Sequence, residues 1–294
     1  MNYLLLLLST LAAAAKGIMC KKIGSDTENK KRMFLYNGVI FFTASLVILI
    51  SLSSRLGEIA GLSRYSFLLA LAFAFFLLFT QTTEILAMNF GSVSLTMLIY
   101  SCGFLIPIFY GSIFLSESIS AFQITGLGIL IVSMVLIISP KKGEKISFPW
   151  LIFSALAMLG SGTNAVIQKI HQASEYKTEL MPFLFWALFF SSIFSFIACF
   201  LTRGGTSERE SAKSSALATV IFLLLGGVCV GVLNILNLHL AGKIPAVVQF
   251  PTYSIGSIII TGLAGKFIFR ETLSTKKLVG FGIGCIAITI IALL

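Results

Sequence analysis

Long apolar runs separated by short polar segments dominate the pattern of this chain. A transmembrane helix needs about 20 mostly apolar residues to cross a hydrocarbon core of about 30 Å. By this measure the sequence predicts ten spans, at 3–20, 34–52, 65–88, 92–115, 120–138, 148–170, 181–201, 216–239, 245–268 and 275–294. We therefore expect an all-α integral membrane protein with ten transmembrane helices.

The lengths of the connections between these spans repeat along the chain. Four connections are short enough for helical hairpins, and they follow the third, fourth, eighth and ninth predicted spans. The same order of long and short connections in both halves predicts two units of five spans. We place the first unit at 1–139, a linker at 140–147 and the second unit at 148–294.

One short phrase is also written twice. Residues 111–130 read GSIFLSESISAFQITGLGIL and residues 265–284 read GKFIFRETLSTKKLVGFGIG, at an offset of 154. The shared positions are Gly111 and Gly265, Glu117 and Glu271, Ser120 and Ser274, Gly126 and Gly280, Gly128 and Gly282, and Ile129 and Ile283. Because five is odd, the second unit must enter the membrane from the opposite side. This predicts inverted repeats related by a pseudo-two-fold axis in the membrane plane.

The repeated phrase resembles a known family. A tight hairpin, a Glu, a short polar turn and a Gly-rich last span, as in ESISAFQITGLG and ETLSTKKLVGFG, are similar to the EamA family of the drug/metabolite transporter superfamily. The resemblance covers nearly the whole chain as two EamA-like repeats. It implies a ten-helix carrier that moves small metabolites or drugs by alternating access. It also implies that the first, third and fourth helices of each repeat line the cavity and that the fifth packs outside.

The signature residues of the phrase have a structural interpretation. Ser120 and Gln123 have the spacing of a capping box, and a carboxylate at Glu117 near a helix N-terminus gains about 0.3–1 kcal/mol from the exposed amides. Small residues four apart favour close helix packing. We therefore assign structural roles to Glu117, Gly126, Glu271 and Gly280.

Composition agrees with a lipid environment and excludes several classes of protein. Of the 294 residues, 57% are hydrophobic and only 11% are charged, too much apolar surface for one soluble core. The net charge of +10 comes from Lys and Arg between the apolar runs, which fits membrane orientation better than nucleic-acid binding. Two histidines and five cysteines without a Cys-x-x-Cys form no zinc pattern. We expect no metal, no cofactor and no nucleic acid, and a monomer or homodimer in the lipid bilayer.

The cations also bear on location and orientation. None precedes the first apolar run, and Lys16, Lys21 and Lys22 follow it, so we interpret this run as a retained span and not as a signal peptide. Fourteen Lys and Arg lie in odd-numbered connections and five in even-numbered ones, which favours termini outside the cytoplasm. The family resemblance implies termini inside. We expect a multi-pass protein of the plasma membrane, the cytoplasmic membrane in a bacterium.

Polar residues inside spans are candidates for a site because they are costly in hydrocarbon. Gln81 and Glu84 in the third span share one helical face, as Asn234 and Asn237 do in the eighth. Glu84 would bind a cationic or zwitterionic substrate or carry a coupling proton; alternatively it reaches the headgroups from near its helix end. We assign Lys16 to the headgroups on the same reasoning.

The fourth and ninth spans add aromatic and amide groups beside prolines. Pro107 and Pro251 each free a backbone carbonyl, and tyrosine faces suit an organic cation. Ordinary packing around a kink is the alternative. The candidate substrate-binding residues are Gln81, Glu84, Tyr100, Asn164, Asn234, Asn237, Gln249 and Tyr253.

These features favour a secondary active transporter for a small organic metabolite that is cationic, zwitterionic or amino-acid-like. The sequence contains no P-loop, so an ion gradient, of H⁺ or another coupling ion, or solute exchange would supply the energy. A flippase for lipids or lipid-linked substrates is the alternative. A membrane-embedded enzyme is less favoured because the longest polar loops hold no nucleophile and base together. A channel is disfavoured by the predicted midplane site.

Overall fold

The computed structural model describes residues 1–23, 30–52, 57–91, 93–137, 147–202, 216–268 and 274–293. These residues form helices, and no strand occurs within those ranges. The helices are α1 (Asn2–Ile23), α2 (Lys30–Ser51), α3 (Gly57–Ala60), α4 (Arg64–Phe90), α5 (Val93–Ser101), α6 (Leu105–Phe114), α7 (Ala121–Ile137), α8 (Phe148–Ala173), α9 (Leu180–Leu201), α10 (Ala216–Ala241), α11 (Ala246–Ile268) and α12 (Thr275–Leu293), with 3-10 turns η2 (Cys102–Phe104) and η3 (Lys177–Glu179).

The outer surface of the bundle is apolar, as a lipid environment requires. Within the described residues, eight segments are long and apolar enough to cross a membrane: α2, α4, α5 to α6, α8, α9, α10, α11 and α12. The apolar parts of α1 and α7, Asn2–Ile18 and Ala121–Ile137, are shorter. Large apolar side chains such as Phe200 and Phe267 are 88% and 78% exposed, an arrangement that would be an aggregation hazard in water. The all-α prediction is therefore confirmed within the described residues, and the eight long apolar segments are compatible with a multi-pass membrane protein.

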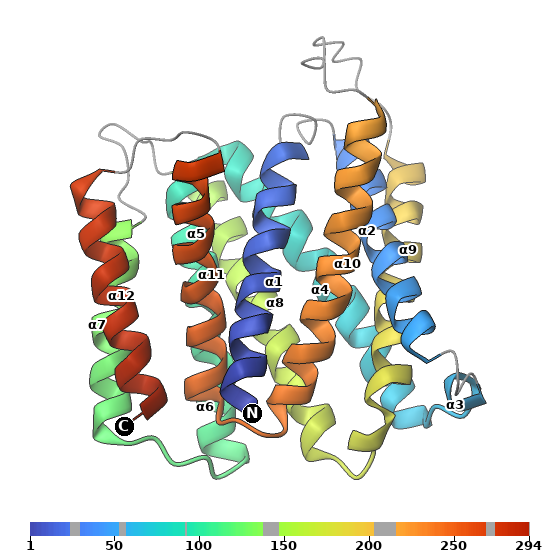
Figure 1. Ribbon diagram of the computed structural model, residues 1–294. Coiled ribbons are helices and arrows are strands. Elements are labelled where there is room, and N and C mark those ends of the chain that lie inside the picture. Colours follow the sequence, from blue (N-terminus) through green and yellow to red (C-terminus); the bar gives the residue numbers. More distant parts are fainter. Residues whose placement is uncertain are drawn as a thin grey trace.

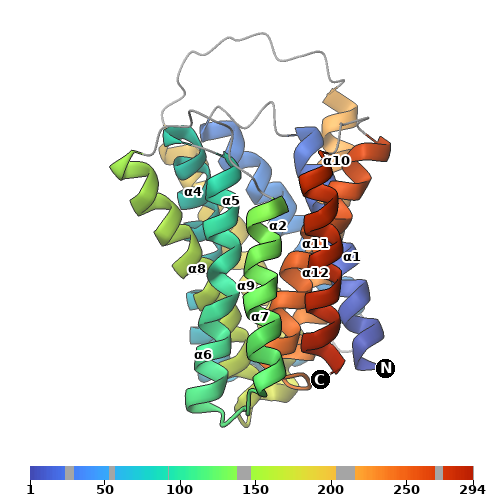
Figure 2. The same ribbon diagram turned by 90° about the vertical axis from the view of Figure 1, so that its left-hand side faces the viewer.

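The helices run side by side in one bundle, and both termini lie at the same end of it (Figure 1). We call this the terminal end. The connection from α6 to α7 and the connection from α10 to α11 lie there as well (Figures 1 and 2). The hairpins that follow the fourth and eighth predicted spans are thus on the same side of the bundle.

Helix packing joins elements that are far apart in the sequence. The α4 helix packs along α8, α1 along α10, and α2 along α9. The α7 and α12 helices pack on each other at one edge of the bundle (Figures 1 and 2). One cluster of buried apolar side chains unites α1, α6, α7, α10, α11 and α12, and a second unites α2, α4, α8, α9 and α10. Polar groups between the clusters are therefore enclosed by protein.

The fourth span differs from the single helix over 92–115 that the sequence predicts. It consists of α5, η2 and α6, with the break at Cys102–Phe104. Pro107 has no N–H to offer the carbonyl of Gly103, so the α-helical ladder is interrupted just before it. A Cβ on Gly103 would lie 2.8 Å from the carbonyl oxygen of Met158, so the break packs backbone to backbone on α8. In the ninth span Pro251 lies inside the continuous α11, so only one of the two prolines interrupts a helix.

The structural interpretation of the repeated phrase can be followed in α7 and α12. The capping box is confirmed: the amide of Ser120 donates to Gln123 Oε1 at 3.1 Å, and the amide of Gln123 donates to Ser120 Oγ at 3.1 Å. A Cβ on Gly126 would lie 2.7 Å from Ile291 of α12, and one on Gly280 would lie 2.8 Å from Ile137 of α7. These two glycines therefore allow the α7–α12 contact. Glu271 lies outside the described residues.

Candidate functional site

A cavity of about 310 Å³ lies inside the bundle, between helices from the two halves of the chain. Its walls come from α1, α2, α4, α5 and η2 on one side and from α8, α10 and α11 on the other. No lining residue comes from α7 or α12. The volume is at the small end of the range of about 300–1,000 Å³ that is typical of ligand pockets.

Seven of the eight candidate residues line this cavity. They are Gln81, Glu84, Tyr100, Asn164, Asn234, Asn237 and Tyr253. The eighth, Gln249, is fully buried behind the wall, where its Nε2 donates at 2.7 Å to the carbonyl oxygen of Asn237. Gln249 therefore supports a lining residue, and the cavity wall does not include it.

Glu84 faces the protein interior. It lines the cavity together with Gln81, three residues earlier on α4. The α4 helix continues to Phe90, so Glu84 lies about 9 Å before the helix end at 1.5 Å per residue. The alternative in which Glu84 reaches lipid headgroups does not fit this position.

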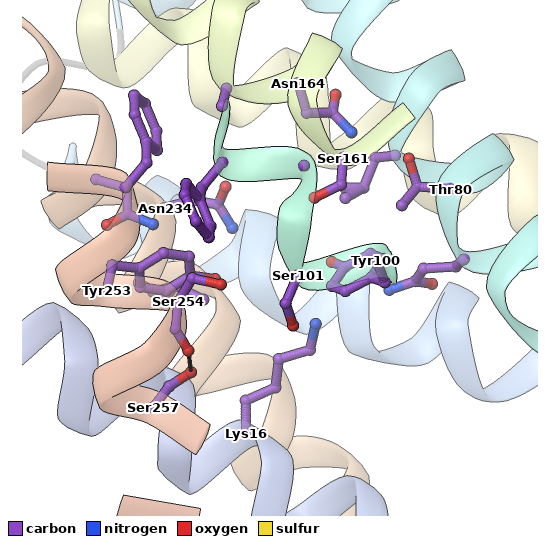
Figure 3. Close-up of a pocket in the computed structure, with 18 of the residues that line it drawn as sticks. Lys16, Thr80, Tyr100, Ser101, Ser161, Asn164, Asn234, Tyr253, Ser254 and Ser257 are labelled. Carbon is purple, nitrogen blue, oxygen red and sulfur yellow. Dashed lines mark hydrogen bonds between the residues drawn. The ribbon is translucent and has the colours of Figure 1, made fainter. Parts of the chain in front are cut away.

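Lys16 also lines the cavity, and its assignment to the headgroups is wrong. The α1 helix runs on to Ile23, so Lys16 lies about 10 Å before its end. Figure 3 shows its ammonium group pointing toward Ser101 and Tyr100 at the break in the fourth span. Lys16 interacts electrostatically with Glu84. Sequence reasoning missed this residue because it placed the end of α1 three residues early.

The break in the fourth span forms one wall of the cavity. Tyr100, Ser101, Gly103 and Phe104 all line it, opposite Ser161 and Asn164 of α8 in the same lining. Backbone that leaves the helical ladder is tolerated within a membrane where it is buried in protein or lines a cavity. The sequence signals for this wall were Pro107 and the polar residues before it.

Several amides around the cavity already have partners. Asn234 Nδ2 donates at 2.9 Å to the carbonyl oxygen of Val230, and Asn237 Oδ1 accepts from Ser9 Oγ of α1. With its amide oriented to satisfy both groups, Asn164 donates to the carbonyl oxygen of Phe73 at 3.1 Å. Asn237 therefore connects α10 to α1 and Asn164 connects α8 to α4, whereas the bond of Asn234 lies within α10.

Two glutamines differ from the asparagines. Gln81 Oε1 on α4 and Gln168 Oε1 on α8 are buried and have no hydrogen-bond partner within the described part of the chain. Both residues line the cavity. Both Oε1 atoms have almost no accessible surface, so they lie within the protein wall and do not face the open space of the cavity. Gln168 lies one turn after Asn164 on α8 and was not among the candidate residues.

Between the cavity and the terminal end, Glu117 connects three parts of the chain. Its Oε1 accepts from Lys169 Nζ at 2.6 Å, and its Oε2 accepts from the amide of Ala246 at 2.6 Å. Lys169 Nζ also donates at 2.8 Å to the carbonyl oxygen of Ile244. Ala246 is the first residue of α11, so Glu117 caps a helix of the other half. We expected the Glu117 carboxylate to stabilise the N-terminus of α7, but it binds the N-terminus of α11 instead. Its role is still structural.

The comparisons with known proteins bear on the fold. No family model matches the sequence, and no curated protein sequence matches it. Chains of solved structures do match, 28 in all. One of them, a crystal structure, has a TM-score of 0.77 at 9% sequence identity, covering 98% of this chain and 95% of that one. A likeness at this identity shows a shared fold over nearly the whole chain.

Proposed function

We propose that this protein is a secondary active transporter that moves a small organic metabolite across the plasma membrane by alternating access. The cavity is the observation that carries the proposal. It lies inside an apolar bundle, it is lined by polar and ionisable side chains, and both halves of the chain contribute to it. Ionisable groups within a membrane protein are rare and mark substrate or ion pathways.

The proposal includes ten spans arranged as two inverted repeats, as in the EamA family. The first repeat comprises α1, α2, α4, the α5–α6 segment and α7, and the second comprises α8 to α12. Helix packing supports this pairing. In this pairing α1 corresponds to α8, α2 to α9 and α4 to α10. The contact between α4 and α8 then corresponds to the contact between α10 and α1, and the contact between α2 and α10 to that between α9 and α4. The α2–α9 and α7–α12 contacts map onto themselves, as a two-fold axis requires.

The substrate is small and cationic, zwitterionic or amino-acid-like. Glu84 suits a protonated amine, and Tyr100 and Tyr253, which line the same cavity, offer aromatic faces. Glu84 is also the residue through which a proton gradient would be coupled to transport. Opening of the same cavity first to one side and then to the other follows from the exchange of two similar repeats.

A ligand screen tests the proposal. The purified full chain is heated with a library of cations, amino acids, nucleosides and lipids, and a ligand present at 100 times its Kd stabilises by about 2.7 kcal/mol. We expect an organic amine or amino acid to stabilise the protein and to show counterflow in proteoliposomes. The Glu84→Gln variant loses counterflow, and Thr125→Ala, on the exposed surface of α7, retains it. Stabilisation by lipids alone, with counterflow absent, favours the flippase and overturns the proposal.

A further inference from the structure

A layer of buried residues separates the cavity from the terminal end. On α8 the cavity lining reaches Gln168, and on α11 it begins at Phe250, so the lining stops short of the nearby ends of both helices. Beyond it lie apolar side chains that are at most 6% exposed and belong to one buried cluster: Ile108, Leu240, Ile244, Ala246 and Val247. This layer closes the cavity toward the terminal end.

Charged groups lie within this apolar layer. Lys169 follows Gln168 on α8, and its side chain is 2% exposed. Its Nζ donates to Glu117 Oε1 at 2.6 Å and to the carbonyl oxygen of Ile244 at 2.8 Å. Glu117 Oε2 accepts from the amide of Ala246 at 2.6 Å. The contact thus joins the α6–α7 connection of the first half of the chain to α8 and to the α10–α11 connection of the second half.

On the basis of the proposed function, we propose that this contact is a gate of the transport site. We call the four residues Glu117, Lys169, Ile244 and Ala246 the terminal gate. In this conformation the terminal gate holds the cavity closed at the terminal end, and its bonds break when the cavity opens to that side. A carrier that alternates between two conformations needs such a contact, because only one side of the cavity is open at a time.

The turn before α7 is built to hold the Glu117 carboxylate in this place. Ser116 has a φ of 55°, in the left-handed region that residues with a side chain adopt at a cost. The Glu117 amide donates to the carbonyl oxygen of Gly111 at 3.0 Å, and the missing side chain of Gly111 leaves room for the carboxylate. Strained backbone persists only where the surrounding structure fixes it, and it is concentrated at functional sites and switch regions. The strained turn therefore supports a switching role for Glu117.

An ion pair suits a contact that must break. Separating buried apolar side chains exposes them to water, and this cost keeps a purely apolar layer closed. Lys169 and Glu117 instead gain hydration when they separate, which offsets the attraction that they lose. The pair therefore specifies the closed arrangement and opposes opening less than apolar residues of the same size would.

Removing one charge and removing both charges should act differently on the terminal gate. Glu117→Gln or Lys169→Met leaves one uncompensated charge, which is buried in the closed conformation and hydrated in the open one. The open conformation is then favoured, because a buried charge without a partner is strongly unfavourable. The double variant Glu117→Gln/Lys169→Met leaves a neutral layer and favours the closed conformation.

Labelling of a cysteine in the cavity measures which side is open, and it requires no substrate. The five native cysteines are replaced by serine, and Ala165→Cys places one thiol in the cavity lining. A charged thiol reagent that does not cross the membrane is added to intact cells or to inverted membrane vesicles. Thr178→Cys, at an exposed position in the α8–α9 connection at the terminal end (Figures 1 and 2), identifies the preparation that presents the terminal side.

Each single variant should raise the labelling rate from the terminal side by about 10-fold and lower the rate from the opposite side. The double variant should be labelled from the terminal side no faster than the parent protein. Lys243→Met, at an exposed lysine of the same α10–α11 connection, is the matched control and leaves both rates unchanged. If Glu117→Gln fails to fold, Lys169→Met and the double variant provide the same comparison.

Three results overturn the inference. In the first, the single variants are labelled from the terminal side at the parent rate. In the second, their labelling rises from both sides, as a merely loosened structure requires. In the third, the double variant is labelled as fast as the single variants. Each of these results leaves the transporter proposal standing if a compound from the library shows counterflow, whereas absence of counterflow for every compound is a failure of the transporter proposal itself.

Discussion

Removing Glu117 from its ion pair with Lys169 should destabilise the folded protein more than removing Lys169 does. The Lys169 side chain is 2% exposed and the Glu117 side chain is 19% exposed. Breaking a buried ion pair by removing one partner typically costs about 3–5 kcal/mol, because the other charge remains buried and uncompensated. The charge that is left behind, more than the charge that is removed, therefore determines the size of the effect.

Glu117→Gln leaves the Lys169 ammonium almost fully buried, where it still donates to the carbonyl oxygen of Ile244 at 2.8 Å. We expect a loss near the upper limit, about 5 kcal/mol. Lys169→Met leaves a carboxylate that still accepts from the amide of Ala246 and reaches some solvent. We expect a loss near the lower limit, about 3 kcal/mol. The double variant removes both charges and should lose less than the two single variants together.

Reversible chemical unfolding in detergent micelles, followed by far-UV circular dichroism, measures these losses. Lys177→Met, at an exposed lysine in η3, is the matched control and should change stability by less than about 0.5 kcal/mol. A larger loss for Lys169→Met than for Glu117→Gln would refute the reasoning from burial. Strictly additive losses in the double variant would show that the two groups do not interact.

Four further predictions concern packing, helix propensity, capping and orientation. Gly103→Ala should destabilise the protein by about 1–3 kcal/mol, because its Cβ would lie 2.8 Å from the carbonyl oxygen of Met158. Gly128→Ala, where a Cβ meets nothing within 4 Å, should stabilise by up to about 1 kcal/mol in the same unfolding assay. Ser120→Ala removes the cap that receives the amide of Gln123 and should cost about 1 kcal/mol, again measured by unfolding. Because both termini lie at one end (Figure 1), reporters fused to either terminus should indicate the same side of the membrane, and a cytoplasmic signal would contradict the orientation drawn from the loop charges.

The apolar pattern predicted the helices well because period and length are local properties of the sequence. Polar residues inside spans were also visible, and helical spacing was enough to select Gln81 with Glu84 and Asn234 with Asn237, all of which line the cavity. The cost of burying such groups in lipid makes each of them conspicuous.

What the sequence did not reveal depends on contacts between distant segments. Glu117 meets Lys169 and Ala246 across separations of 52 and 129 residues, and no local pattern specifies those partners. Pro107 and Pro251 look alike in sequence, yet only the segment before Pro107 packs its backbone on α8. Lys16 was assigned to the headgroups because the predicted span ended at residue 20. Helix α1 continues to Ile23, which places Lys16 deeper, in the lining of the cavity.

The close approach of Glu117 to Gly111 has a consequence for how this chain can evolve. A Cβ on Gly111 would lie 2.6 Å from Glu117 Oε2, so any side chain at position 111 would push the carboxylate away from Ala246 and Lys169. A side chain at position 111 is therefore compatible with this structure only if residue 117 changes as well. Gly265 and Glu271 stand at the same spacing in the second half of the sequence. The same pair of residues, a glycine and a glutamate six positions later, thus occurs in both halves of the chain.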